Sequence, residues 1–108
     1  LHEACSDVSA RRGVVITTEL VNADPPATCD PAILDALEAS AAAAGKTFKR
    51  MISRAYHDSL FMARIAPAAM LFIPCRGGVS HRPDEYASPE WIGAGIHVLA
   101  RTLASLAS

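Results

Sequence analysis

The stretch CRGGVSHRPDEY, residues 75–86, gathers most of the residue types that can do chemistry in this 108-residue chain. It holds a cysteine, a histidine and two adjacent carboxylates, and its two glycines allow a sharp turn. Three interpretations are open: an ordinary surface turn, a thiol site on Cys75, or a metal site on His81. A second polar stretch, SRAYHDS at residues 53–59, adds His57.

A thiol site would need a pocket for an anion directly after Cys75. Cysteine phosphatases and sulfurtransferases build such a pocket from backbone N–H groups and an arginine, followed by a helix N-terminus. The phosphatase pattern wants its arginine six residues after the cysteine, but His81 stands there and Arg82 comes one residue later. Asp84 and Glu85 then bring negative charge where an anion would bind. A Cys75-based thiol enzyme therefore stays an alternative.

His81 is the stronger candidate, as a metal ligand. Neutral imidazole binds zinc or manganese, and nearby carboxylates can orient a ligating histidine. A hydrolytic metal site needs at least three protein ligands, however, and the chain has no H-x-x-E-H or H-x-D pattern. A second alternative is therefore a non-catalytic α/β module in which His57 and His81 only make loop hydrogen bonds.

Both polar stretches are expected at junctions between strands and helices. Asp30-Pro31 and Ser88-Pro89 each combine an N-cap residue with proline at the first helical position, and Asp58 could cap a third helix. Apolar spacing and turn residues predict helices over 1–12, 31–44, 58–65 and 89–106, and strands over 14–21, 47–53 and 68–73.

This alternation predicts an α/β fold, layered, with a partly parallel sheet and flanking helices. If the last two strands are parallel neighbours, His57 and His81 converge at one edge of the sheet. The segment NADPPATCDP, residues 22–31, has three prolines and no periodicity, so we expect a linker there.

Composition excludes some classes of function. A net charge of −1 gives no electrostatic footprint for nucleic acid or an anionic membrane. No run reaches the roughly 18 apolar residues that a membrane span needs. The three cysteines, Cys5, Cys29 and Cys75, form no C-x-x-C pair and no even-numbered disulfide framework. They favour a reducing compartment, the cytoplasm.

Longer motifs carry a family resemblance. GVSHRPDEY, residues 78–86, matches the pattern G-x-S-H-x-P-x-E-Y, and the run MISRAYHDSLFMARI is most like ureidoglycolate amidohydrolase. Residues 13–31 are similar to the return from the lid domain of the same group. The chain thus resembles the C-terminal part of the amidohydrolases acting on ureidoglycolate, allantoate and N-carbamoyl-L-amino acids, a branch of the aminoacylase-type binuclear metallopeptidase family.

The resemblance implies the chemistry of the site. His81 would be the last ligand of a site for two divalent metal ions, zinc or manganese, and His57 would bind the substrate or stabilise the oxyanion of the tetrahedral intermediate. The reaction would be hydrolysis of a linear C–N bond in a ureido or carbamoyl compound by metal-activated water. The catalytic glutamate would lie upstream, so no catalytic residue is assigned. Asp84 and Glu85 are expected to fix the loop.

The same resemblance implies the organisation of the chain. Residues 1–22 would be the tail of a lid domain of the dimerisation type, 23–31 a linker, and 32–108 the C-terminal part of the catalytic domain. The full-length enzyme would be a homodimer acting on a small molecule. Such a fragment would be inactive by itself.

Overall fold

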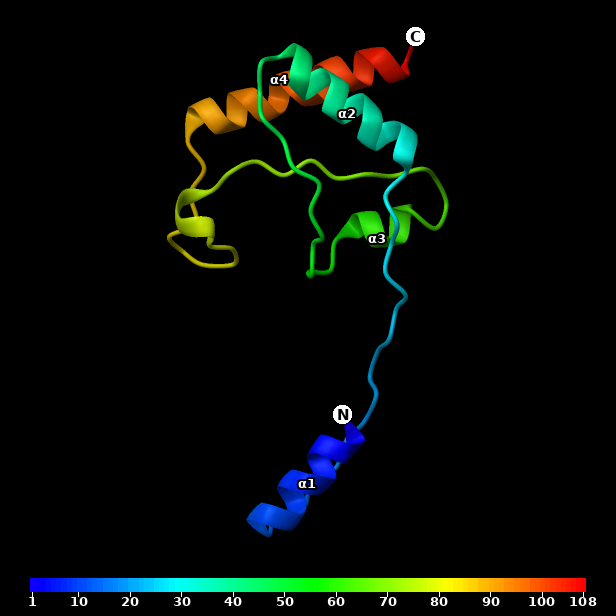
Figure 1. Cartoon of the computed structure of the whole chain (residues 1–108), viewed down its shortest axis with the longest axis vertical. Helices are drawn as coiled ribbons and strands as arrows, with labels where there is room; N and C mark the ends of the chain where they lie inside the picture. Colours follow the sequence, from blue (N-terminus) through cyan, green and yellow to red (C-terminus); the bar gives the residue numbers. More distant parts are fainter.

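Helices are the only regular secondary structure in the chain. The computed structural model describes all residues from 1 to 108. Its elements are α1 (His2–Arg12), α2 (Pro31–Ala43), α3 (Asp58–Met62), the short 3-10 helix η1 (Arg76–Gly78) and α4 (Pro89–Leu106) (Figure 1). None of the helices combines the length and hydropathy needed to cross a bilayer.

The predicted layered α/β fold is wrong, because the structure contains no β-strand and no sheet. The segments expected as strands, 14–21, 47–53 and 68–73, are irregular connections between helices. A strand exists only where a neighbouring strand receives its N–H and C=O groups. These segments form no such ladder. Ala68, at the start of the last segment, accepts a single main-chain hydrogen bond, from Asp30 N–H at 2.8 Å. The β-branched and apolar composition of these segments therefore did not predict whether they pair with one another as strands.

The helix boundaries follow the capping residues read from the sequence. The Asp30 carboxylate accepts the Ile33 N–H at 3.0 Å at the start of α2, and Ser88 Oγ accepts the Trp91 N–H at 3.3 Å at the start of α4. Gly13 ends α1 with φ +65°, a left-handed conformation that glycine adopts without strain. These three predictions are confirmed.

The third helix differs from its prediction. Its N-cap is His57, and Asp58 is the first helical residue, where its carboxylate faces the positive end of the helix dipole. The helix ends at Met62 rather than continuing to Ile65. The expectation that Asp58 caps α3 is therefore wrong, and His57 lies at the junction itself.

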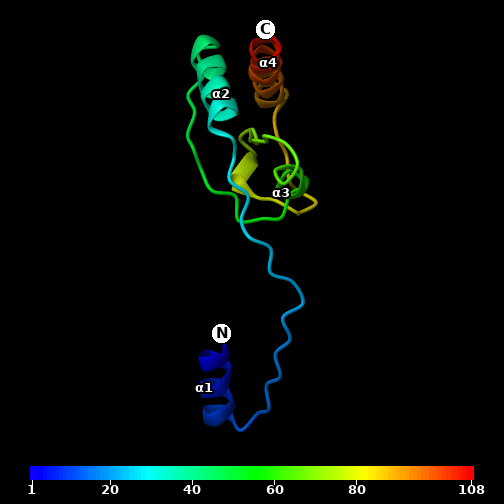
Figure 2. The same cartoon turned by 90° about the vertical axis from the view of Figure 1, so that its right-hand side faces the viewer.

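The helices α2 and α4 pack side by side and are the only pair of helices in contact (Figures 1 and 2). Their interface holds the chain's buried residues, which are small: Ser40, Ala41, Val98 and Thr102. Thr102 Oγ1 donates to the Val98 carbonyl at 2.9 Å, which satisfies the one hydroxyl that the interface buries most deeply.

The molecule as a whole is open. Its radius of gyration is 19.7 Å, against about 13 Å for a compact domain of this length. Its accessible surface is 8799 Å², against about 5,800 Å² for a folded monomer of this mass. The helix α1 lies apart from the others at the end of the drawn-out segment 14–29 (Figure 2). A large excess of surface, much of it apolar, is therefore in contact with solvent.

Candidate functional site

His57 is held from two sides at the junction before α3. Its backbone is extended, with φ −140° and ψ 154°. Its ring Nε2 lies 2.6 Å from Ser53 Oγ, and its ring meets Phe72 edge-on, with centroids 5.7 Å apart and an interplanar angle of 63°. The side chain is half-buried, so the ring is fixed by the protein yet open to a small molecule.

The loop carrying His57 is tied to the linker by Asp24. The Asp24 carboxylate accepts hydrogen bonds from Arg64 Nη2 at 2.5 Å, Asn22 Nδ2 at 3.0 Å and the Tyr56 hydroxyl at 3.4 Å. The hydrogen bond from Arg64 is the main reason why the pKa of Asp24 is lower than that of an ordinary aspartate. Asp24 thus joins the linker, the segment just after α3 and the residue before His57.

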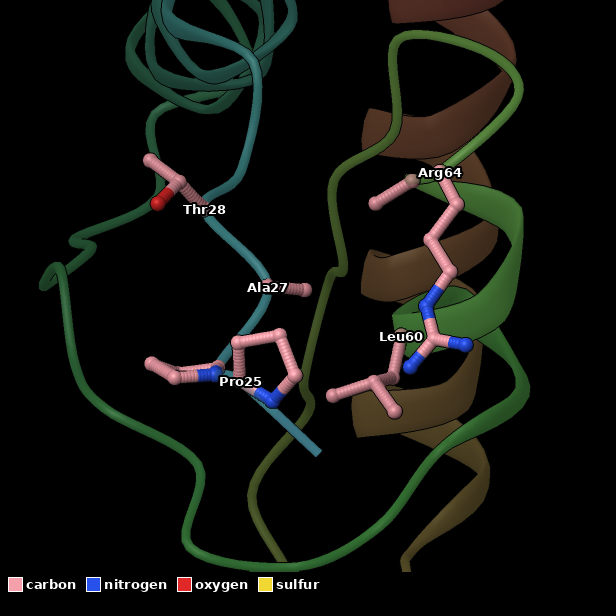
Figure 3. A pocket seen from close by; sticks show the side chains of 7 residues that line it. Pro25, Ala27, Thr28, Leu60 and Arg64 are labelled. Carbon is pink, nitrogen blue, oxygen red and sulfur yellow. The ribbon is translucent and has the colours of Figure 1, made fainter. Parts of the chain in front are cut away.

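A shallow pocket lies between the linker and α3. Figure 3 shows Ala27 of the linker pointing toward Leu60 of α3, with Pro25 and Thr28 beside it in the linker and Arg64, just after α3, on the opposite side. Arg64 is the only titratable group in its lining, and its guanidinium already binds Asp24. The pocket therefore offers packing between two segments and no reacting group of its own.

His81 lies at the tip of a closed loop. The Arg76 N–H donates to the Tyr86 carbonyl at 2.8 Å and so closes the loop over residues 76–86. Gly77 and Gly78 have φ values of +69° and +65°, as a sharp turn requires. His81 itself has φ +57°, the only positive value at a residue other than glycine.

The carboxylates of this loop are engaged within it. Glu85 Oε2 accepts the His81 backbone N–H at 2.9 Å. Both Asp84 oxygens accept from the Arg82 guanidinium at 2.9 Å. The Arg76 guanidinium lies over the Tyr86 ring, 5.1 Å from its centroid. The expectation that Asp84 and Glu85 fix the loop agrees with these contacts.

The imidazole of His81 suits the role of one metal ligand. The side chain is exposed, and its ring nitrogens make no hydrogen bond within the chain. The chain holds no group of three or more His, Cys, Asp or Glu residues close enough to bind a metal ion together. His81 could therefore supply one ligand, and a complete set would need ligands from beyond these residues.

The structure does not bring the two histidines into contact, and the sheet edge on which they were expected to converge does not exist. Sequence reasoning also missed Ser53, Asp24 and Phe72. The spacing of Ser53, four residues before His57 within SRAYHDS, was the available signal. For Asp24 and Phe72, which lie far from His57 in the sequence, no local signal existed.

The surroundings of Cys75 do not form an anion pocket. Its thiol donates to the Val79 carbonyl at 3.2 Å, and a carbonyl oxygen offers an anion nothing to bind. The nearest arginine in sequence, Arg76, stacks on Tyr86 and donates to the Asp84 carbonyl at 3.4 Å. The geometry argues against a thiol enzyme on Cys75.

Comparisons with known proteins agree with the motifs. The family model of peptidase family M20/M25/M40 matches residues 8–105. Ureidoglycolate hydrolase from Oryza sativa subsp. japonica is 49% identical over 107 residues, which are 98% of this chain and 22% of that protein. Ureidoglycolate hydrolase from Arabidopsis thaliana is 46% identical over the same shares of the two chains.

A solved structure gives the same result in three dimensions. The crystal structure of AtUAH in complex with (S)-hydroxyglycine matches with a TM-score of 0.83 and 46% identity, over 97% of this chain and 25% of that one. The chain thus spans about a fifth to a quarter of the length of these relatives. The resemblance noted in the sequence is confirmed.

Proposed function

Since the chain belongs to peptidase family M20/M25/M40, we propose that it forms the C-terminal part of a metal-dependent amidohydrolase that cleaves a linear C–N bond. Its substrate is a small ureido or carbamoyl compound, ureidoglycolate or an N-carbamoyl amino acid. The observation that carries the proposal is the 49% identity, over nearly the whole chain, to a ureidoglycolate hydrolase. The loop geometry of His57 and His81 is compatible with the roles that follow.

In this proposal His81 is a ligand of a centre for two divalent ions, zinc or manganese. Its exposed imidazole has two unengaged nitrogens, and the closed 76–86 loop presents it in one backbone conformation. When bound, such ions polarise the carbonyl under attack and lower the pKa of water. The rest of the centre would come from residues outside this chain, among them a glutamate that moves the proton.

His57 binds the substrate. A ring N–H can donate to a ureido carbonyl or carboxylate oxygen, and this bond strengthens as the oxygen gains negative charge in the tetrahedral intermediate. Its half-buried position favours such a bond, because a contact screened from water is worth more than one in bulk solvent. His57 therefore contributes to binding and to the rate.

The division of the chain follows the same proposal. Residues 1–22 are the tail of a lid domain, 23–31 a linker and 32–108 the C-terminal part of the catalytic domain. The separation of α1 from the α2–α4 unit supports this division (Figure 1). We also propose a homodimer for the full-length enzyme, and the cytoplasm as its compartment because all three cysteines are free thiols.

A hybrid enzyme tests the roles of the two histidines. The matching 22% of the rice ureidoglycolate hydrolase would be replaced by residues 1–108 of this chain. The hybrid should hydrolyse ureidoglycolate and bind metal, whereas the 108-residue chain by itself should do neither. His81→Ala should lower the bound metal by at least one equivalent. His57→Ala should keep the metal and lower kcat/KM by about 10²-fold or more.

His97→Ala is the matched control, because His97 is an exposed histidine of α4 with no proposed role. It should leave both metal content and rate unchanged. Unchanged metal content in His81→Ala would remove the ligand role. Ammonia release by the isolated chain, dependent on metal, would contradict the proposal that the remaining ligands lie elsewhere.

A further inference from the structure

We propose that Ser53 is a positioning residue for His57: its hydroxyl donates to Nε2 and thereby holds the imidazole in the tautomer that carries its proton on Nδ1. The inference deepens the proposed function, since it gives His57 a defined hydrogen-bond donor for the substrate. It rests on that proposed function for its catalytic consequence but not for the tautomer itself.

The direction of the Ser53–His57 hydrogen bond follows from counting protons. Ser53 Oγ has one proton to donate and two lone pairs. The Ala55 N–H donates to this oxygen at 3.4 Å, so one lone pair is occupied. The other partner of the hydroxyl is His57 Nε2, 2.6 Å away. If the Ser53 hydroxyl accepts from the Ala55 N–H and donates its own proton to His57 Nε2, both its acceptor and its donor are used.

An imidazole nitrogen that accepts a hydrogen bond carries no proton of its own. Neutral His57 must therefore carry its proton on Nδ1, and the identity of the free donor is set by the bond at the opposite nitrogen. Nδ1 makes no hydrogen bond within the chain. It is left as an N–H donor, which is what a carbonyl or carboxylate oxygen of a ureido compound accepts.

Phe72 gives the ring its second restraint. Its ring meets His57 edge-on at 5.7 Å and comes from the segment after α3, far in sequence from Ser53. A ring flip would move Nε2 away from the hydroxyl and would lose the Ser53 hydrogen bond. The hydrogen bond thus sets the tautomer, and the aromatic contact adds an apolar neighbour to the same ring.

Nitrogen NMR of the imidazole tests the tautomer directly. The hybrid enzyme is labelled with 15N-histidine, and its His57→Gln variant identifies the His57 signals by their loss. The expected result is the Nδ1–H pattern for His57 at a pH where the ring is neutral. Ser53→Ala should shift it toward the Nε2–H form, and Ser53→Thr, which keeps the hydroxyl, should preserve it.

Ser59→Ala is the matched control in the same region. The Ser59 hydroxyl lies 2.8 Å from Met70 Sδ and does not touch His57, so its removal should leave the His57 tautomer unchanged. An Nε2–H pattern for His57 in the hybrid enzyme without further substitutions would overturn the proposal. So would an equal shift of the His57 signals in Ser59→Ala and Ser53→Ala, because it would trace the effect to general loosening of the loop.

Kinetics of the hybrid enzyme test the consequence. Loss of one oriented hydrogen bond predicts a fall in kcat/KM of about tenfold in Ser53→Ala, recovery in Ser53→Thr and no change in Ser59→Ala. In a His57→Ala background Ser53→Ala should add no further loss, because the serine acts through the histidine. A full additional loss in that background would refute the positioning role.

The two levels of the proposal fail separately. The Nδ1–H tautomer together with an inactive hybrid would leave the Ser53–His57 pair intact and remove the proposed function. An active hybrid that depends on His57 but not on Ser53 would keep the function and remove the positioning role.

Discussion

Replacement of Gly95 by alanine probes how the segment 67–75 packs under α4. A Cβ atom on Gly95 would lie 2.5 Å from Ile73 Cγ2 and 3.9 Å from Ile73 Cβ. Gly93, two residues earlier in the same helix, would meet nothing within 4 Å. Substitution by alanine therefore makes the same chemical change at both positions of the helix, with a clash at Gly95 and without one at Gly93.

The magnitude follows from two opposing effects. Alanine is better than glycine in a helix interior by about 0.5–1 kcal/mol, which applies at both positions. Carbon atoms attract one another best at about 3.5–4.0 Å, so an approach to 2.5 Å is strongly repulsive and must be relieved by a shift. Overpacking of this kind costs about 1–3 kcal/mol. Gly95→Ala should lower the free energy of unfolding by about 1 kcal/mol, and Gly93→Ala should raise it by about 0.5–1 kcal/mol.

Urea unfolding followed by circular dichroism at 222 nm measures both free energies, because α2 and α4 carry most of the helical signal. Ile73→Leu provides the rescue, since leucine lacks the branched Cγ2 methyl group that would clash and keeps the Cβ at an acceptable distance. In the double variant the alanine should recover its helix-forming advantage, with a coupling of about 1–2 kcal/mol between the two sites.

Equal stability of Gly95→Ala and Gly93→Ala would refute this reasoning. It would mean that Ile73 does not rest on α4 in solution and that the segment 67–75 is held by other contacts. A destabilised Gly95→Ala that Ile73→Leu does not rescue would place the clash elsewhere on the helix.

Three further outcomes follow from individual contacts. Because the pKa of Asp24 is lowered, the Asp24–Arg64 hydrogen bond is fully present above the ordinary aspartate pKa and is lost only as the pH falls through the lowered pKa. In Arg64→Gln the midpoint of the Asp24 carboxyl 13C titration should therefore rise. Glu85→Ala removes the acceptor of the His81 N–H, so the HN–Hα coupling of His81 should move from its left-handed value, whereas Glu85→Gln should retain it. The exposed apolar side chains of α4 predict that the chain self-associates in sedimentation experiments, and Ile96→Glu, at a residue that is 63% exposed, should reduce this association.

Features set by a few neighbouring residues were predictable from the sequence. The Asp30-Pro31 and Ser88-Pro89 starts were correct because a capping side chain needs only the N–H three residues later. The sharp turn at Gly77-Gly78 was correct for the same reason, since the backbone conformation depends on the glycine itself. His81, by contrast, adopts a positive φ that its residue type does not demand and that Glu85 supports.

The strands could not be predicted because pairing is a property of two segments. The run AMLFIP is apolar and would suit a buried strand, yet an apolar segment becomes a strand only beside a partner that accepts its main-chain bonds. In this chain Ile73 packs on α4 instead, through its side chain. The prediction of a covered strand was therefore wrong in both respects: the segment is irregular, and Leu71, Phe72 and Ile73 are 40%, 50% and 36% exposed.

The two candidate residues illustrate how far local contacts can build a site. His57 is held by Ser53, four residues before it, and the backbone of His81 by Glu85, four residues after it. Each histidine is therefore oriented by a contact that forms within its own loop, and each orientation survives in a chain whose overall structure is open. The distance between the two loops has no such local control, because it depends on how α3 and the 76–86 loop pack against the rest of the protein. The hydrogen bond that orients each histidine is thus local, whereas the Phe72 contact of His57 and the convergence of the two histidines on one substrate must come from tertiary packing.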